Sequence, residues 1–504
     1  MNCSDFTLYD MIAGNAARHP DRDAVVCGER RMTFGDWRKQ CDQYAAGLVR
    51  EGLSRGDRIA VVAGNEDDFL TLLGAAAKIG AIAVPVNWRL SEDEIAYILQ
   101  DTQPTLLFTG SEHLDQAGKA AAKVNAIAKR YHFGAGGGTD GFLPFEALRR
   151  EDGCEASGAA SGHFPFLIIH TAATGGKPRG SVLAQANLIA AGLQIAHLLK
   201  LDGRDANICI LPLFHIGGLS MTVATMLSGG KTVLVDRFDP STVLSLIERE
   251  RGTFFAAFPP ILSSVLDVQQ KESFDTASLR IVCGMDRPET IESFLKHNPQ
   301  ASFYSIYGQT EAMPVSGVDH AARPGSIGLP AILTRAAIFD DLDREVPPGL
   351  TGEICVRSPA VFQGYWNLAE DTDHTLRSGW HRTGDLGRRD AEGFLWYAGR
   401  KPEKELIKSG GENVYPAEVE KIILSHGAIE EVCVIGVPDP EWGEAVRAFC
   451  VLKKGHALSA EALIDFVAAR IARYKKPRQV VFMESLPRTA GGAVDREAVR
   501  KISA

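Results

Sequence analysis

The sequence lacks several features that would place a protein in a broad class at once. Its nine cysteines are scattered singly with no CxxC pair, which gives no indication of a zinc or redox motif and suits a reducing compartment. Acidic residues (63) outnumber lysines and arginines (54), and the net charge of −9 argues against a broad nucleic-acid-binding surface. No stretch approaches the roughly 20 apolar residues of a membrane span. The segment Met1 to Tyr9 carries Asp5 and no basic, apolar run, so we expect a cytoplasmic protein without a signal peptide.

What the chain does contain is an alternation of helix and strand patterns. With 504 residues, 45% of them hydrophobic, it is too long for one simple core, and we expect at least two units. Apolar spacing predicts helices at 34–49, 69–78 and 92–99, and strands at 58–63, 81–85, 105–108 and 164–169. Ser91 and Glu94 have the spacing of a capping box at the start of the third helix. This rhythm predicts an α/β fold with parallel or mixed sheets covered by helices.

A change of composition near Arg400 predicts a domain boundary. The stretch 400–408 is rich in Lys and Glu and contains Pro402, which is typical of a hinge. Beyond it, the patterns predict helices at 417–424 and 459–471, and strands at 431–437 and 447–452. We therefore expect a large N-terminal domain, residues 1–400, and a small mobile α+β domain, residues 401–504.

A glycine-rich loop follows the predicted strand at 164–169. It reads His-Thr-Ala-Ala-Thr-Gly-Gly-Lys-Pro-Arg-Gly from His170 to Gly180. Glycines let the backbone approach a phosphate group, whose oxygens exposed N–H groups can bind. The loop is not a Walker A motif, which requires GxxxxGK[ST]. Its composition indicates a phosphate site, and a flexible surface turn is the alternative.

This loop resembles the phosphate loop of the acyl-adenylate-forming superfamily, which includes acyl-CoA synthetases, adenylation domains of peptide synthetases and firefly-type luciferases. The usual pattern is YTSGTTGxPKG. Here Ala172 and Ala173 replace Ser and Gly, Gly175 replaces a Thr, and Arg179 replaces the Lys. The resemblance implies ATP binding by five residues of the loop, with a catalytic role for the second threonine: Thr171, Thr174, Gly175, Gly176 and Lys177.

Two later segments resemble the walls of the acid and adenine sites in this superfamily. The segment LPLFHIGG, residues 211–218, implies an acid pocket in which His215 lies near the reacting carboxylate. Gly217 and Gly218 would leave room there. Residues 278–284 lead into the adenine segment, which implies nucleotide contacts by Gly284, Met285 and Asp286.

The pentapeptide YGQTE, residues 307–311, matches the superfamily's YGxTE motif. Tyr307 offers an aromatic face to adenine, and Thr310 can donate to the α-phosphate. Glu311 is a hard oxygen ligand suited to Mg²⁺ that bridges phosphates. The resemblance also places Gly308 and Gln309 in the ATP site.

The remaining motifs imply ribose, hinge and coenzyme A contacts. Trp-His-Arg-Thr-Gly-Asp, residues 380–385, matches W-x-x-TGD, so Asp385 would accept hydrogen bonds from both ribose hydroxyls, with Arg400 as a second contact. Residues 404–416 nearly match the signature in which Lys404 would be the pivot of the small domain. The strand carrying Ser409, Gly410 and Gly411 would line the channel for the pantetheine arm of coenzyme A.

One position departs from the superfamily where its catalytic lysine is expected. The pattern PRTxxGK has its lysine replaced by Ala493, although the residues on both sides keep the family pattern. We expect impaired adenylation. Two explanations stay open: a deliberate Lys→Ala replacement, or a natural variant in which another cation such as Lys404 or Lys408 substitutes.

The resemblance implies an ATP-dependent acid:CoA ligase with ATP, Mg²⁺ and coenzyme A as ligands. An apolar pocket wall with His215 as its only obvious polar group favours an aromatic or medium-chain monocarboxylate. Two alternatives remain: a stand-alone adenylation domain that loads a carrier protein, and a silent relative that binds nucleotide and regulates. Neither a nucleic-acid partner nor a membrane span is expected, and the oligomeric state is open, a homodimer being one option.

Overall fold

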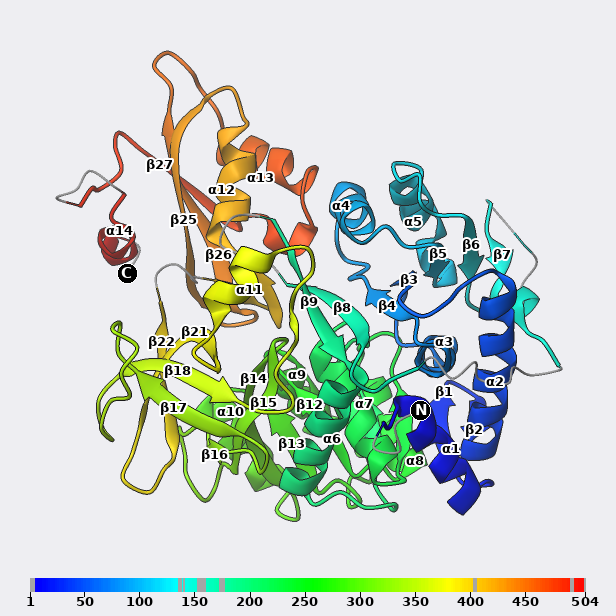
Figure 1. The fold of residues 1–504 in the computed structure, drawn as a ribbon. Coiled ribbons are helices and arrows are strands. Elements are labelled where there is room, and N and C mark those ends of the chain that lie inside the picture. Colours follow the sequence, from blue (N-terminus) through cyan, green and yellow to red (C-terminus); the bar gives the residue numbers. More distant parts are fainter. Residues whose placement is uncertain are drawn as a thin grey trace.

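The computed structural model describes residues 5–134, 138, 141–151, 160–171, 177–401, 406–489 and 494–502. Within these ranges, three sheets with their covering helices form a large N-terminal body, and a fourth sheet belongs to a small C-terminal domain beside it (Figure 1). The fold is therefore mixed α/β, as the sequence predicts.

The first sheet of the body carries the strands on either side of the glycine-rich loop. Its core strands β3, β4 and β5 are parallel and almost wholly buried, whereas β8 and β9 are antiparallel. In spatial order, its strands are β19 (Gly364–Tyr365), β9 (Arg179–Ala184), β8 (Pro165–Thr171), β4 (Ile82–Pro85), β3 (Arg58–Val62), β5 (Leu106–Thr109), β6 (Lys129–His132) and β7 (Leu143–Pro144).

The second sheet runs mostly parallel from β1 to β14 and ends in antiparallel strands. In spatial order, its strands are β16 (Leu329–Pro330), β15 (Ala312–Asp319), β14 (Ser302–Gln309), β13 (Ile281–Gly284), β12 (Phe254–Ala257), β10 (Ala206–Cys209), β11 (Lys231–Leu234), β1 (Asp23–Cys27) and β2 (Arg30–Thr33). Residues 307–309 form the C-terminal end of strand β14.

The third sheet is antiparallel and carries the TGD motif. Its strands are β17 (Arg335–Phe339), β18 (Gly352–Arg357), β21 (Trp380–Arg389), β20 (Leu376–Arg377) and β22 (Leu395–Arg400). The small domain has strands β24 (Glu412–Val414), β23 (Ile407–Ser409), β26 (Gly443–Leu452), β25 (Ile429–Asp439) and β27 (Gln479–Met483).

The helices of the body form its outer layers and the packing between its sheets. They are α1 (Leu8–Arg18), α2 (Phe34–Arg50), α3 (Asp67–Ile79), α4 (Glu92–Thr102), α5 (Leu114–Ala121), α6 (Gln185–Leu199), α7 (Ile216–Leu227), α8 (Pro240–Glu250), α9 (Ile261–Gln269), α10 (Pro288–His297) and α11 (Ala369–Thr375). Those of the small domain are α12 (Pro416–Leu424), α13 (Ala460–Ala468) and α14 (Arg496–Ile502). None of the described helices is long and apolar enough to cross a membrane.

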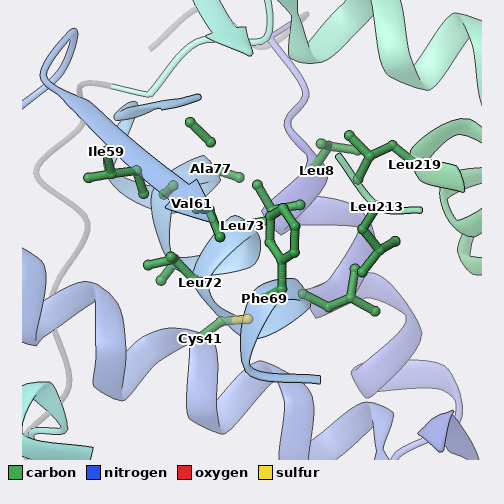
Figure 2. Packing of buried hydrophobic residues seen from close by; sticks show 14 of the residues in the cluster. Leu8, Cys41, Ile59, Val61, Phe69, Leu72, Leu73, Ala77, Leu213 and Leu219 are labelled. Carbon is green, nitrogen blue, oxygen red and sulfur yellow. The ribbon is translucent and has the colours of Figure 1, made fainter. Parts of the chain in front are cut away.

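The largest core cluster joins the first sheet to helices α1, α2, α3 and α7. Phe69 lies at its centre, fully buried among Leu8, Leu73, Leu213 and Leu219 (Figure 2). Burying a side chain of this size stabilises the fold by roughly 1.5–3 kcal/mol relative to leaving it exposed. This cluster holds the strands that frame the candidate site in fixed positions.

Most predicted elements are confirmed with small shifts of their ends. Helix α2 begins at Phe34 as predicted, and Ser91 and Glu94 form the predicted capping box of α4. The helix predicted at 459–471 ends at Ala468, and the chain then turns through a short 3₁₀ helix, η4 (Arg473–Lys475). This turn brings Lys475 to the large domain, as described below.

Candidate active site

The residues of the TGD and YGxTE motifs meet where β14, β21 and β22 come together. Asp385 and Arg400 are cross-strand neighbours, and the Arg400 Nε lies 3.1 Å from Asp385 Oδ1. The Tyr307 hydroxyl and the Gln309 side-chain amide each donate to Asp385 Oδ2 at 2.6 Å. Gly384 has φ +71, a left-handed conformation that favours glycine between Thr383 and Asp385.

Hydrogen bonds fix the orientation of the Asp385 carboxylate, which can accept further hydrogen bonds. It is 1% exposed, and its Oδ2 already accepts two hydrogen bonds, so Oδ1 keeps capacity for further donors beside Arg400. Burial, together with the charge of Asp385, raises the pKa of Tyr307 well above its ordinary value, so this phenol stays a donor. The arrangement suits a pair of vicinal hydroxyls.

Glu311 is surrounded by hydroxyl groups. Its Oε1 accepts from Tyr365 at 3.0 Å, from Ser181 at 3.3 Å and from Thr171 at 3.4 Å. Burial, and secondarily the Glu311 charge, raises the pKa of Tyr365, which therefore remains protonated. Among the described residues no group of three or more His, Cys, Asp or Glu side chains could hold a metal ion. A lone carboxylate such as Glu311 has the chemistry to hold Mg²⁺, an ion that keeps several of its waters in protein sites.

The two ends of the glycine-rich loop lie in β8 and β9, where Thr171 and Ser181 contact Glu311. Thr171 ends β8, Lys177 is exposed, and Arg179 begins β9. The Arg179 guanidinium lies 4.1 Å from the centroid of the Tyr365 ring and 3.4 Å from Asp371. The three loop residues expected to bind phosphate through their backbone or hydroxyl, Thr174, Gly175 and Gly176, lie outside the described residues.

The segment predicted to contact adenine begins at the end of β13, and a turn follows β14. An added Cβ at Gly284, with φ +137, would lie 2.0 Å from the Ala257 carbonyl oxygen, so the close approach of β12 and β13 requires glycine. Met285 is 40% exposed, and burial raises the pKa of Asp286. Gly308 lies near the end of β14, and Thr310 lies in the turn between β14 and β15. An added Cβ at Gly308 would lie 2.5 Å from Met313 Sδ.

His215 occupies the start of α7 and faces a carboxylate from the small domain. Its Nε2 lies 3.3 Å from Glu412 Oε2, and Arg89 Nη1 lies 2.7 Å from Glu412 Oε1. Asn87 also donates to Glu412, at 3.3 Å. Burial alone would raise the pKa of Glu412, but the charges of His215 and Arg89 lower it to about 2. Glu412 is therefore a buried anion that joins the two domains at the predicted acid pocket.

The two glycines after His215 have different surroundings. An added Cβ at Gly218 would lie 2.3 Å from the Pro212 carbonyl oxygen, so this glycine is needed for backbone packing at the start of α7. At Gly217, an added Cβ would lie 3.2 Å from the Leu211 side chain. Gly218 therefore serves the helix start and does not by itself open space for a ligand.

The Gly-Gly turn of the small domain lies against the large domain. Gly410 has φ +60, donates to the Trp442 carbonyl at 3.0 Å, and has no room for a Cβ, which would lie 2.5 Å from the Trp442 ring. Ser409 is buried, and an added Cβ at Gly411 would lie 3.8 Å from Phe258 Cβ. The turn thus lies beside the segment that directly follows β12.

Two segments of the chain, one in the large N-terminal body and one in the small domain, match known family models. Residues 12–366 match the AMP-binding enzyme family, and residues 418–493 match the AMP-binding enzyme C-terminal domain. The chain belongs to the AMP-binding enzyme family. It is 35% identical to an indoleacetate–CoA ligase of Aromatoleum aromaticum, over 99% of this chain and 98% of that protein. It is 32% identical to a feruloyl-CoA synthase of Amycolatopsis, over 96% and 97%.

Solved structures of relatives differ in how well they superpose. An o-succinylbenzoate CoA synthetase of Bacillus subtilis, 28% identical and covering 97% of both chains, gives a TM-score of 0.86 when bound to a CoA product analogue. Its complex with the acyl-adenylate gives 0.70. An amide bond synthetase of Marinactinospora thermotolerans, 26% identical over 99% of both chains, gives 0.88. This AMP-binding enzyme therefore superposes better on the CoA-analogue complex than on the adenylate complex.

Val494, the first described residue after position 493, lies on the other side of the small domain. Ala493 and the expected pivot Lys404 lie outside the described residues, but Val494 pairs with Arg488 and packs on the face of β25 and β26 that carries α14. The opposite face carries α12 and α13 and shares Tyr474 with the core of the large domain. Alternate residues of a strand point to opposite faces, so these two surfaces are distinct. Figure 1 shows α14 on the side of the small domain away from α4.

Sequence reasoning missed the partners that the tertiary structure supplies. The sequence does not single out Arg89 and Tyr365, because they lie in no recognised motif. Glu412 lies within a motif, the segment 404–416, but has no assigned role there. The sequence does offer a signal for Glu412, because this residue directly follows the Gly-Gly pair that is expected to line the coenzyme A channel.

Proposed function

We propose that this AMP-binding enzyme joins a carboxylic acid to coenzyme A through an acyl-AMP intermediate. In the first step a carboxylate oxygen attacks the α-phosphorus of ATP, the bond to the bridging oxygen breaks, and pyrophosphate leaves. In the second step the CoA thiolate attacks the acyl carbon, the bond to the phosphate oxygen breaks, and AMP leaves. Family membership and the site geometry both support this reaction.

The nucleotide half of the proposal rests on the cluster around Asp385. Its Oδ1, with Arg400 beside it, would accept the ribose hydroxyls, while Tyr307 and Gln309 hold the carboxylate in place. Glu311 would hold Mg²⁺, an ion that neutralises phosphate charge when bound. Thr171 and Lys177 flank the loop that would take up the phosphates.

The observation that carries the thiol step is the contact of Glu412 with His215. It places the Gly410–Gly411 turn on the large domain next to the predicted acid pocket, while the segment next to position 493 lies on the opposite face. The better superposition on the CoA-analogue complex agrees with this arrangement. We propose that it is the thiol-accepting arrangement, with Ser409, Gly410 and Gly411 beside the pantetheine arm.

Two finer parts of the proposal concern the domain boundary and the acid. A boundary after residue 400 is supported by the sheets, because β22 ends at Arg400 within the large domain and β23 begins the small one at Ile407. A hydrophobic acid is supported by the buried apolar residues around the start of α7, such as Phe214 and Met221. The aryl acids in the names of two relatives, indoleacetate and ferulate, agree with that class.

The test is a screen of aromatic and C2–C12 monocarboxylates, read by pyrophosphate release and by acyl-CoA formation. Malonate and free amino acids serve as polar controls, and an amine and a carrier protein replace CoA in parallel reactions. We expect a hydrophobic acid and CoA to give the fastest turnover. Preferred transfer to the amine or the carrier would refute the thiol assignment, and a best substrate among the polar acids would refute the hydrophobic pocket.

A further inference from the structure

One face of helix α4 touches both the small domain and the ends of the glycine-rich loop. Glu94, Tyr97 and Asp101 are spaced i, i+3 and i+7, which places them on the same side of the helix. Each of the three makes a contact that leaves the helix. We call this set the α4 polar face.

At the N-terminal end of this face, Glu94 binds the small domain. Lys475 Nζ lies 2.7 Å from Glu94 Oε1 and 2.7 Å from Glu418 Oε2, and its side chain is only 3% exposed. The Ala472 N–H donates to Glu94 Oε2 at 3.0 Å, and the same oxygen accepts from the Ser91 N–H at 2.8 Å. The capping box of α4 and the seating of the small domain therefore share one carboxylate.

At the other end, the face reaches both sides of the loop. The Tyr97 hydroxyl donates to the Pro178 carbonyl at 3.2 Å, just before β9 begins. Asp101 Oδ2 lies 2.9 Å from Nε2 of His170, whose side chain is 2% exposed in β8. The Trp366 indole N–H binds the Asp101 carbonyl at 3.2 Å. The strand before the loop and the residue after it are thus both tied to α4.

We propose that the α4 polar face couples the seating of the small domain to the residues on both sides of the glycine-rich loop. Lys475, Glu94, Tyr97 and Asp101 are its positioning residues. The helix is held near both ends by contacts with other elements. A shift of its first turn when Lys475 leaves would move Tyr97 and Asp101 with it. The idea rests on the proposed function, in which the loop holds phosphates and the small domain changes position between two half-reactions.

The coupling differs from a general effect of domain contact, because a second ion pair bypasses α4. Arg89 and Glu412 also join the domains, but Arg89 precedes α4 and Glu412 faces His215. Arg89→Met therefore loosens the interface without removing any contact of the α4 polar face. It is the matched control for Lys475→Met.

The test is hydrogen exchange of the nucleotide-free full-length protein, followed by mass spectrometry of peptides from α4, from residues 177–181 and from β12 as an internal reference. We expect Lys475→Met to accelerate exchange in α4 and at 177–181 by about 5-fold or more relative to β12, Lys475→Arg to restore much of the protection, and Arg89→Met to leave 177–181 unchanged. Unchanged exchange at 177–181 in Lys475→Met, or an equal change in Arg89→Met, overturns the proposal.

A second variant tests the coupling in the opposite direction, from the loop side to the small domain, and serves if the Lys475→Met protein fails to fold. Coupling is reciprocal, so Tyr97→Phe, which removes one hydroxyl, should accelerate exchange of the amide of Ala472, and no change there overturns the proposal. The measurement needs no nucleotide. A protein that shows the coupling but does not bind ATP would refute the proposed function alone, whereas one that binds ATP without the coupling would refute this inference alone.

Discussion

Replacing Glu412 by Gln removes the charge that joins the small domain to the predicted acid pocket. The Glu412 side chain is 9% exposed between Arg89 and His215. A pKa of about 2 instead of an ordinary 4.5 corresponds to roughly 3 kcal/mol in favour of the charged form, at 1.36 kcal/mol per pKa unit. If the separated domains return Glu412 to water, this is the upper limit of what its charge contributes to seating, on the order of 10²-fold in the equilibrium.

The assay separates the two half-reactions. We expect Glu412→Gln to slow the reaction of preformed acyl-AMP with CoA by about 10- to 100-fold, while acyl-AMP formation changes much less. Glu430→Gln, at an exposed glutamate of the same domain, is the control. Equal loss in both half-reactions, or no loss in the thiol step, would refute the reasoning.

The same carboxylate predicts a pH dependence. Because the folded pKa of Glu412 is lowered, its stabilisation of the seated domain is fully present above pH 4.5 and is lost as the pH falls towards about 2. Small-angle scattering between pH 6 and 3 should show the small domain separating on acidification in the parent. In Glu412→Gln, the scattering should already resemble the separated form at pH 6, and a profile like that of the parent would contradict this assignment.

Three further substitutions test other parts of the site. Asp385→Ala should abolish ATP binding in a titration and also lower the melting temperature, since it leaves the buried Tyr307 hydroxyl without its acceptor at a cost of about 1–3 kcal/mol; unchanged ATP affinity would refute the ribose assignment. Ala493→Lys should raise pyrophosphate release by about 10²–10³-fold and leave the thiol step on synthetic acyl-AMP nearly unchanged, and equal gains in both would contradict separate roles for the two faces. Gly218→Ala should destabilise the protein by about 1–3 kcal/mol in a denaturant titration because its Cβ would lie 2.3 Å from the Pro212 carbonyl oxygen, and a neutral effect would refute that packing argument.

Local patterns in the sequence were sufficient to predict much of the fold. The helix at Phe34, the capping box of Ser91 and Glu94, and the buried strands around 58–63 and 105–108 depend on spacing and caps that act over a few residues. The motifs around Glu311 and Asp385 likewise predict the chemistry, through their resemblance to the superfamily patterns YGxTE and W-x-x-TGD. These features follow from short-range physical chemistry.

Only the tertiary structure decided which side chains form ion pairs or hydrogen bonds with residues far away in the chain. Glu412 meets His215 and Arg89, and Lys475 meets Glu94, across separations of hundreds of residues. Nothing in local periodicity specifies such pairs, because they depend on how two separately folded domains dock. The sequence by itself determined the elements and the chemistry of this protein, whereas the docking of its domains determined which face of the small domain lies at the site.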